Sequence, residues 1–223
     1  MPSLSRRRKL RSVFHSDAPS RVDVYLAQLS VLYEDLGIEL ESIDSAMPSA
    51  LENPTVAYRQ NYFFRRSLAT LSDFAEAIRL LDKCPDFALF RENFHQALLT
   101  DWQDGVAYFE GLEQHLKAVR NDIGGHFGSQ AAEFAIKEMP HRAVGAIEIA
   151  EERVHGPDAK RPHLRFAFDI AVSAIFRRLQ GAKDTETAMT ELGGFFVEVK
   201  NAYRHACRAT HVLVAALLWP RFG

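Results

Sequence analysis

An apolar stripe that runs from about residue 55 to residue 83 is the longest regular pattern in this sequence. Its members recur at helical spacing: Phe64, Leu68, Leu71, Phe74, Ala75, Ile78 and Leu81. Residues spaced in this way share one face of an α-helix, and a continuous apolar face has to be buried against other elements. Pro85 then stops the pattern. We therefore expect a long helix at the centre of the core of an all-α fold.

Amphipathic segments on both sides of this stripe predict further helices. The first covers residues 21 to 44, and Asp17 or Ser20 is placed to cap its start. Its apolar positions are Val24, Leu29, Leu32, Leu36 and Leu40. The later predicted segments are a short stretch from residue 87 to 98, helices at 102 to 119, 131 to 139 and 166 to 179, and a last helix from about residue 185 to 219 that Pro220 ends. These segments predict a helical bundle.

One part of the chain carries an alternating pattern instead. Ile147-Glu148-Ile149 and Leu164-Arg165-Phe166-Ala167-Phe168 alternate apolar and polar residues on either side of a loop that contains Gly156 and Pro157. Alternation with this period is typical of a β-strand. We therefore expect a small β-hairpin appendage near residues 144–168 on the helical domain.

Length, charge and cysteine content limit the class of protein. A chain of 223 residues that is 47% hydrophobic is large enough for one well-buried domain. We assign residues 20–223 to a single helical domain and residues 1–19 to a flexible basic leader. The net charge of −2 gives no support for non-specific binding to nucleic acid. The two cysteines, Cys84 and Cys207, are too few for a disulfide framework, so we expect free thiols.

The sequence contains no pattern for export or for membrane insertion. No apolar stretch follows the basic amino terminus, which argues against a secretory signal. The longest late apolar run, at residues 212 to 219, is far shorter than the roughly 20 residues that span a bilayer. We therefore expect a cytoplasmic protein without a membrane partner.

A helix end near the middle of the chain brings together an arginine, a carboxamide and a histidine. Arg120 and Asn121 close the segment that begins at residue 102, and four residues separate Asn121 from His126. Positions six apart do not share a face of a straight helix. Gly124 and Gly125 supply a break that would let His126 fold back toward the preceding turn. Arginine can hold a phosphate and histidine can move a proton near neutral pH, so this group suits phosphodiester chemistry.

The sequence Arg120-Asn121-x4-His126 at the end of a long helix resembles the Arg-polar-x4-His signature of the HEPN superfamily, whose active members are ribonucleases. The resemblance covers this short motif and the order of helices from about residue 21 to residue 139. It implies an antiparallel helical bundle and a homodimer in which two motifs share one cleft. It also implies RNA as substrate, cleavage without a metal or other cofactor to leave a cyclic phosphate, and a role as a toxin or defence effector with an antitoxin or another protein partner.

Each residue of the motif takes a role from this resemblance. Arg120 would hold the scissile phosphate and stabilise the charge of its transition state. His126 would act as general base on the ribose 2′-hydroxyl or as general acid on the leaving oxygen. Asn121 would orient the substrate or the imidazole, and Asp122 is a secondary candidate. The Gly-Gly pair before His126 makes this segment looser than a continuous helix, whereas transition-state stabilisation requires preorganised geometry.

Three alternatives to catalysis stay open. In the structural alternative, Arg120 complements the helix dipole, Gly124 or Gly125 is the C-cap, and His126 only begins the next segment. In the second, the chain is a non-catalytic helical module that binds RNA or a protein partner. In the third, the last two helices hold a small ligand in an apolar pocket.

Other groups of residues suggest weaker hypotheses. His205, Cys207 and His211 can all ligate zinc, but their spacing does not place the three on one helical face, so packed or solvent-facing histidines are favoured. Arg65 and Arg66 could reach RNA, although exposed arginines paired with nearby acids are the commoner outcome. Tyr58 and Tyr62, one turn apart, could line a cleft and stack on a base, although packing in the core is the commoner outcome for such aromatic residues.

Overall fold

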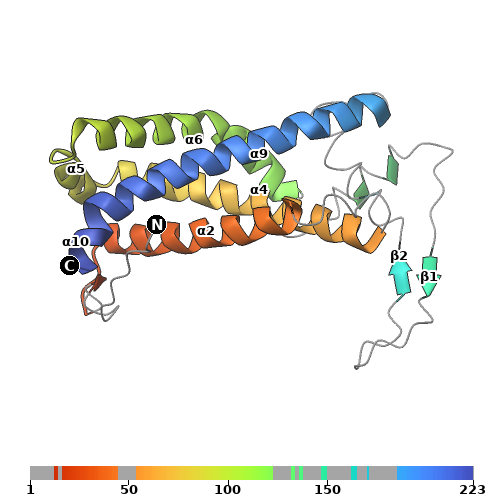
Figure 1. The fold of residues 1–223 in the computed structure, drawn as a ribbon, viewed down its shortest axis with the longest axis horizontal. Coiled ribbons are helices and arrows are strands. Elements are labelled where there is room, and N and C mark those ends of the chain that lie inside the picture. Colours follow the sequence, from red (N-terminus) through yellow and green to blue (C-terminus); the bar gives the residue numbers. More distant parts are fainter. Residues whose placement is uncertain are drawn as a thin grey trace, which may run out of the picture. The chain divides into compact units, whose positions relative to one another are not determined.

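The computed structural model describes residues 13–14, 17–44, 54–122, 132–133, 136–137, 147–149, 162–164, 170 and 185–222. Five helices pack against one another in an all-α fold, as predicted (Figure 1). In chain order, the helical elements are α2 (Arg21–Asp44), α4 (Pro54–Asp82), α5 (Pro85–Arg91), α6 (Gln96–Asp122), α9 (Thr185–Leu213), the π-helical segment η1 (Val214–Leu218) and α10 (Trp219–Phe222). The five packed helices are α2, α4, α5, α6 and α9, and the chain continues from α9 into two short helical segments. Among these, no helix is both long and apolar enough to cross a membrane.

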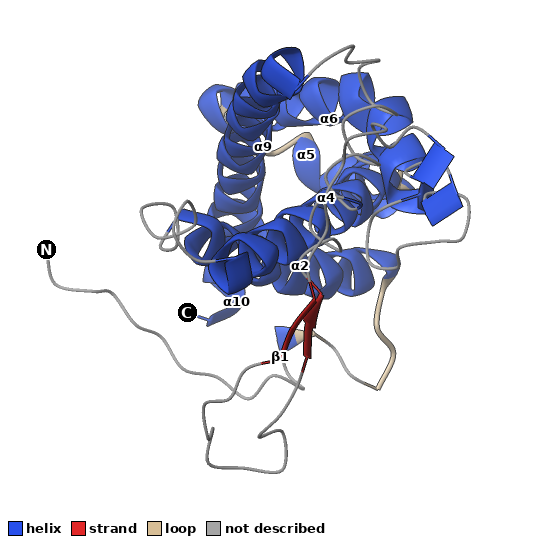
Figure 2. Cartoon of the chain, turned by 90° about the vertical axis from the view of Figure 1, so that its right-hand side faces the viewer, coloured by secondary structure: helices blue, strands red, loops and turns tan. Residues whose placement is uncertain are grey.

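Two short strands accompany the helices. The strands β1 (Ile147–Ile149) and β2 (Pro162–Leu164) pair antiparallel, with Ile147 opposite Leu164 and Ile149 opposite Pro162 (Figure 2). The predicted first strand is confirmed. The second begins earlier than predicted and includes Pro162. Proline has no N–H to donate to a neighbouring strand, so it is tolerated on an edge strand, and both strands of a two-stranded sheet are edge strands. Helical backbone is described at residues 132–133, 136–137 and 170, and the rest of the helices predicted at 131–139 and 166–179 lies outside the described residues.

Contacts along the chain divide it into two compact units. The first comprises Met1–Gly37, Thr70–Lys117 and Val197–Gly223, and the second comprises Ile38–Ala69 and Ala118–Phe196. The first unit therefore contains segments of all five packed helices. The second contains the end of α2, the first part of α4, the last residues of α6, both strands and the first part of α9.

Helix α4 is the central helix that its apolar stripe predicts. All seven stripe residues are buried, and residues 67 to 72 are buried consecutively, which places this part of the helix inside the protein on every side. In the first unit, the rings of Phe74 and Phe109 lie 5.2 Å apart and join α4 to α6. Phe87 of α5 packs against Trp102 of α6, with ring centroids 4.8 Å apart. Large aromatic side chains in contact dominate the energetics of such a core.

Helix α2 has the predicted bounds but a different apolar face near its start. Ser20 is the N-cap: its Oγ accepts a hydrogen bond from the Asp23 N–H at 3.1 Å, and Asp23 Oδ2 accepts one from the Ser20 N–H at 3.1 Å. This reciprocal pair is a capping box with aspartate in the third helical position. The prediction for Val24 was wrong, because its side chain is 53% exposed, and Val22 and Leu26 occupy the core instead.

The stretch predicted from residue 87 to 98 is not one helix. Helix α5 ends at Arg91 and α6 begins at Gln96, so the amphipathic pattern continues across a turn. Asn93 explains the end of α5, because its side-chain amide donates to the carbonyl of Leu89 at 3.2 Å. That hydrogen bond satisfies a carbonyl that has no partner within the helix. Phe87 is buried, whereas Phe90 on the same short helix is exposed.

The carboxyl-terminal helical segment continues past Pro220, contrary to prediction. The N–H of Trp219 donates to the carbonyl of Val214, which is five residues earlier, so the turn before the proline is widened. Proline normally breaks a helix because it lacks an N–H and its ring meets the preceding turn. A π-type turn is one of the arrangements in which such a break is absorbed as a bend. The chain then forms α10, which lies beside the start of α2 (Figure 1).

Candidate functional site

The structure places the first part of the predicted catalytic motif at the end of α6. Arg120 and Asn121 lie in the last turn of this helix, together with Asp122. Both belong to the second compact unit. Gly124, Gly125 and His126 lie outside the described residues, so the return of His126 toward Arg120 stays a prediction.

Further back on α6, Tyr108 stacks on a histidine of α9. The rings of Tyr108 and His205 are 3.9 Å apart and nearly parallel. Burial and the neighbouring Arg208 lower the pKa of His205, and Asp104 opposes this with a smaller effect. The helices approach closely here, since a Cβ added to Gly105 would lie 3.4 Å from the Cβ of Ala209. His205 is therefore a packed histidine whose neutral form is favoured.

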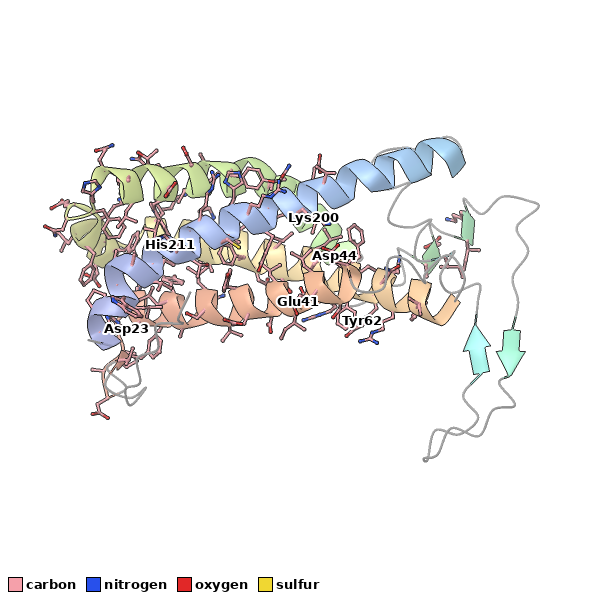
Figure 3. All side chains as sticks on the ribbon, in the orientation of Figure 1. Asp23, Glu41, Asp44, Tyr62, Lys200 and His211 are labelled. Atoms are coloured by element: carbon pink, nitrogen blue, oxygen red, sulfur yellow. The ribbon has the colours of Figure 1, made fainter. Side chains whose placement is uncertain are left out.

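The other members of the proposed metal set have separate surroundings. Cys207 lies 3.8 Å from the hydroxyl of Tyr33, which stacks on Tyr203, and His211 is exposed on α9 (Figure 3). Both cysteines of the chain are free, as predicted. Within the described ranges, no three histidine, cysteine, aspartate or glutamate side chains gather where they could hold a metal ion.

The first part of α4 carries a surface of aromatic rings and guanidinium groups. We call it the aromatic-arginine face, and it consists of Tyr58, Arg59, Tyr62, Phe63 and Arg66. On an ideal helix these positions lie within an arc of about 140° and extend about 12 Å along the axis. Tyr58 and Tyr62 are 42% and 45% exposed, so the interpretation of these tyrosines as core residues was wrong. Figure 3 labels Tyr62 on this helix.

Contacts within the face hold its side chains near one another. The guanidinium carbon of Arg59 lies 5.7 Å from the centroid of the Phe63 ring, within range of a cation–π interaction. The Tyr62 and Phe63 rings meet edge to face with centroids 5.4 Å apart. Arg66 lies 3.7 Å from Glu39 of α2, and its side chain is 42% exposed. Arg59 was not identified from sequence, although it lies one turn before Phe63.

The neighbouring arginine has a different role. Arg65 is buried, contrary to the expectation of an exposed side chain, and its Nε donates to Asn61 Oδ1 at 3.1 Å. Asn61 is buried one turn earlier on the same helix. Since a buried donor needs an acceptor, this pair is part of the packing of α4 and is not available to a ligand.

A second group of charged residues lies in the first unit. Asp23 accepts hydrogen bonds from Ser20 and Arg221, and Arg221 also donates to the carbonyl of Val13 at 3.1 Å. We call Ser20, Asp23 and Arg221 the terminal cluster, because it joins the start of α2 to α10. Figure 3 labels Asp23 at this end of α2. Burial acts to raise the pKa of Asp23, but the hydrogen bonds from Arg221 and Ser20 outweigh it and lower the pKa to about 2.

An open depression of about 530 Å³ lies over the terminal cluster. Its lining consists of Ala18, Ser20, Asp23, Asp86, Leu89, Phe90, Asn93 and Arg221. These residues come from the start of α2, from α5 and its following turn, and from α10. The depression is therefore not the apolar cavity between the last two helices that a small-ligand function would require.

Any functional assignment for this chain depends on its own residues. Its described part supplies two positions of the HEPN-like motif and one exposed surface of aromatic and arginine side chains. Comparison of the chain with protein-family models, curated protein sequences and solved structures gives no significant match.

Proposed function

We propose that this protein is a HEPN-like, metal-independent endoribonuclease that acts as a homodimer and serves as a toxin or defence effector with an antitoxin or another protein partner. The observation that carries the proposal is the position of Arg120 and Asn121 in the last turn of α6, in an all-α chain. Because the helix ends at the motif, it fixes the backbone position from which the Arg120 side chain extends. The Gly-Gly sequence that follows permits the chain to reverse toward it.

The proposed reaction is an intramolecular transesterification of RNA. His126 removes the proton from the ribose 2′-hydroxyl, and the 2′-oxygen attacks the adjacent phosphorus. The bond from phosphorus to the 5′-oxygen of the next nucleotide breaks, and the histidine of the partner protomer protonates that oxygen. The products are a 2′,3′-cyclic phosphate and a 5′-hydroxyl. Arg120 stabilises the charge on the phosphate oxygens through paired hydrogen bonds.

A second candidate function is a non-catalytic module that binds RNA or a protein partner. The aromatic-arginine face favours it, because exposed rings and guanidinium groups supply the chemistry of binding. The two functions differ in one measurable respect, which is turnover of the RNA.

The test compares the parent protein with His126→Ala on mixed RNA in excess EDTA. We expect the parent to produce fragments that end in a cyclic phosphate and the variant to lose at least about 100-fold in rate, since general acid-base catalysis contributes that much. A matched control is His211→Ala, which changes an exposed histidine on α9.

Equal cleavage by the parent and by His126→Ala would overturn the proposed role of His126. Binding of RNA without cleavage by the parent would favour the module. Absence of both binding and cleavage would remove RNA from the proposal.

A further inference from the structure

The aromatic-arginine face differs in composition from an ordinary exposed helix surface. Its five positions hold three aromatic rings and two guanidinium groups, with neither an aliphatic nor an acidic side chain among them. The two tyrosines are exposed, while residues 67 to 72 further along α4 are buried consecutively. The exposed rings are therefore confined to the part of the helix that packing leaves uncovered.

The spacing of the tyrosines fits separated bases. Tyr58 and Tyr62 are four residues apart, which is about 6 Å along the helix axis. Stacked bases in one strand of a duplex rise only about 3.4 Å per nucleotide. Two successive bases that each lie on one of these rings would therefore be drawn apart, a geometry that a single strand can adopt and a duplex cannot. Every base has a π-face, so such stacking does not depend on sequence.

The arginines provide the complementary contacts to the backbone. Arg59 lies beside Phe63, and Arg66 follows Tyr62 by one turn of the helix. Guanidinium groups next to aromatic rings can contact phosphates while the rings take the bases. Glu39 lies 3.7 Å from Arg66 and reduces the local positive charge. We therefore expect stacking to contribute more of the affinity than counterion release.

We propose that the aromatic-arginine face binds single-stranded RNA, with Tyr58 and Tyr62 stacked on successive bases and with Arg59 and Arg66 on the phosphates. The inference rests on the proposed function, because the strand bound here is the one that the ribonuclease cuts. Residues 58 to 66 belong to the same compact unit as Arg120 and Asn121. An aliphatic protein surface would be a poorer partner, since the face offers it no aliphatic side chain.

The test measures binding by fluorescence anisotropy with a labelled 12-nucleotide RNA that has no secondary structure. Its riboses carry 2′-O-methyl groups, which remove the attacking hydroxyl and prevent cleavage whether or not the protein is a nuclease. We expect Tyr58→Ala with Tyr62→Ala to weaken binding about 25-fold or more, because loss of one stacked base costs at least about fivefold. Tyr58→Phe with Tyr62→Phe should bind like the parent, since phenylalanine keeps the ring.

The matched control is Leu89→Ala with Phe90→Ala, which removes two exposed apolar side chains from α5. We expect this pair to leave the dissociation constant within about twofold of the parent. Binding should also weaken with salt at a slope of about −1.4 in log K against log salt, as expected for two phosphates on a single strand. Circular dichroism confirms that each variant keeps its helix content.

The results separate this inference from the proposed function. Binding that requires the two rings, in a parent protein that cuts no RNA, supports the face and overturns the nuclease. Cleavage by the parent together with unchanged binding by Tyr58→Ala with Tyr62→Ala overturns the face and leaves the nuclease in place. Equal losses in the tyrosine pair and the α5 pair, equal losses in the Phe and Ala variants, or equal affinity for a duplex of the same sequence would also overturn the inference.

Discussion

The terminal cluster and the aromatic-arginine face both place an arginine beside a buried acid, but they differ in how much water reaches the arginine. Arg221 binds Asp23, and the two side chains are 18% and 2% exposed. Arg66 lies 3.7 Å from Glu39, and the two side chains are 42% and 7% exposed. In the terminal cluster the same arginine also donates to a backbone carbonyl. In the face, the neighbouring groups are exposed aromatic rings.

This difference shows that the environment of an arginine, more than the presence of an acid, decides its role. A buried carboxylate depends on its cation, because a charge without a partner in a low-dielectric site is costly. Arg66 is half-exposed, so water and salt screen its charge more than they screen that of Arg221. The terminal cluster should therefore affect stability, and the face should affect binding.

The largest expected effect is on the terminal cluster. Arg221→Met removes the cation that faces the buried carboxylate of Asp23, while the hydrogen bonds from Ser20 remain. We expect a loss of about 3 kcal/mol in the free energy of unfolding, which urea titration at pH 7 can measure by circular dichroism. Arg59→Met on the face is the matched control and should stay within about 0.5 kcal/mol of the parent. Similar losses in the two variants would contradict the distinction between these arginines.

A smaller effect follows from the pKa of Asp23. The pKa is about 2 in the folded protein against 3.8 ordinarily, so the unfolded chain binds the proton more readily. The ionised carboxylate therefore contributes roughly 2 kcal/mol of stability above pH 4, and this contribution is lost as the pH falls from about 4 to about 2. Unfolding free energies measured across this range should fall more steeply for the parent than for Asp23→Asn. Parallel pH profiles for the two proteins would contradict this assignment.

The sequence predicted most of the helical fold, because burial imposes a regular period on apolar residues. The stripe on α4 and the bounds of α2 agree with the structure. The errors lie where local hydrogen bonds decide the outcome. Asn93 ends α5 inside a continuing apolar pattern, and the widened turn before Pro220 carries the helix past a residue that usually stops one.

The candidate surface was less predictable than the fold. The spacing of Tyr58 and Tyr62 allowed stacking on bases but favoured packing in the core, and the structure exposes both side chains. Arg65 and Arg66 are adjacent in sequence, yet one is buried against Asn61 and the other is half-exposed. A shift of one residue turns a side chain by about 100°, and only tertiary packing shows which of the two faces water.

The smallest expected effect separates the cap of α2 from the ion pair that it supports. Ser20 Oγ accepts a hydrogen bond from the Asp23 N–H and donates one to Asp23 Oδ2 at 2.8 Å. Ser20→Ala removes both and should cost about 1 kcal/mol in the free energy of unfolding. Ser20→Thr keeps the hydroxyl and should recover most of that loss.

Ser42 is the matched control for this measurement. It lies on the same helix, but its exposed hydroxyl donates to the carbonyl of Ile38, within the body of the helix. Ser42→Ala should therefore be neutral or stabilising by a few tenths of a kcal/mol, because alanine is the better helix former and no cap is lost.

The pH dependence of stability adds a second readout for Ser20→Ala. Since the Ser20 hydrogen bonds help to lower the pKa of Asp23, Ser20→Ala should also reduce the loss of stability between pH 4 and pH 2. An unchanged acid profile in Ser20→Ala would assign the low pKa to Arg221 alone and reduce Ser20 to a helix cap.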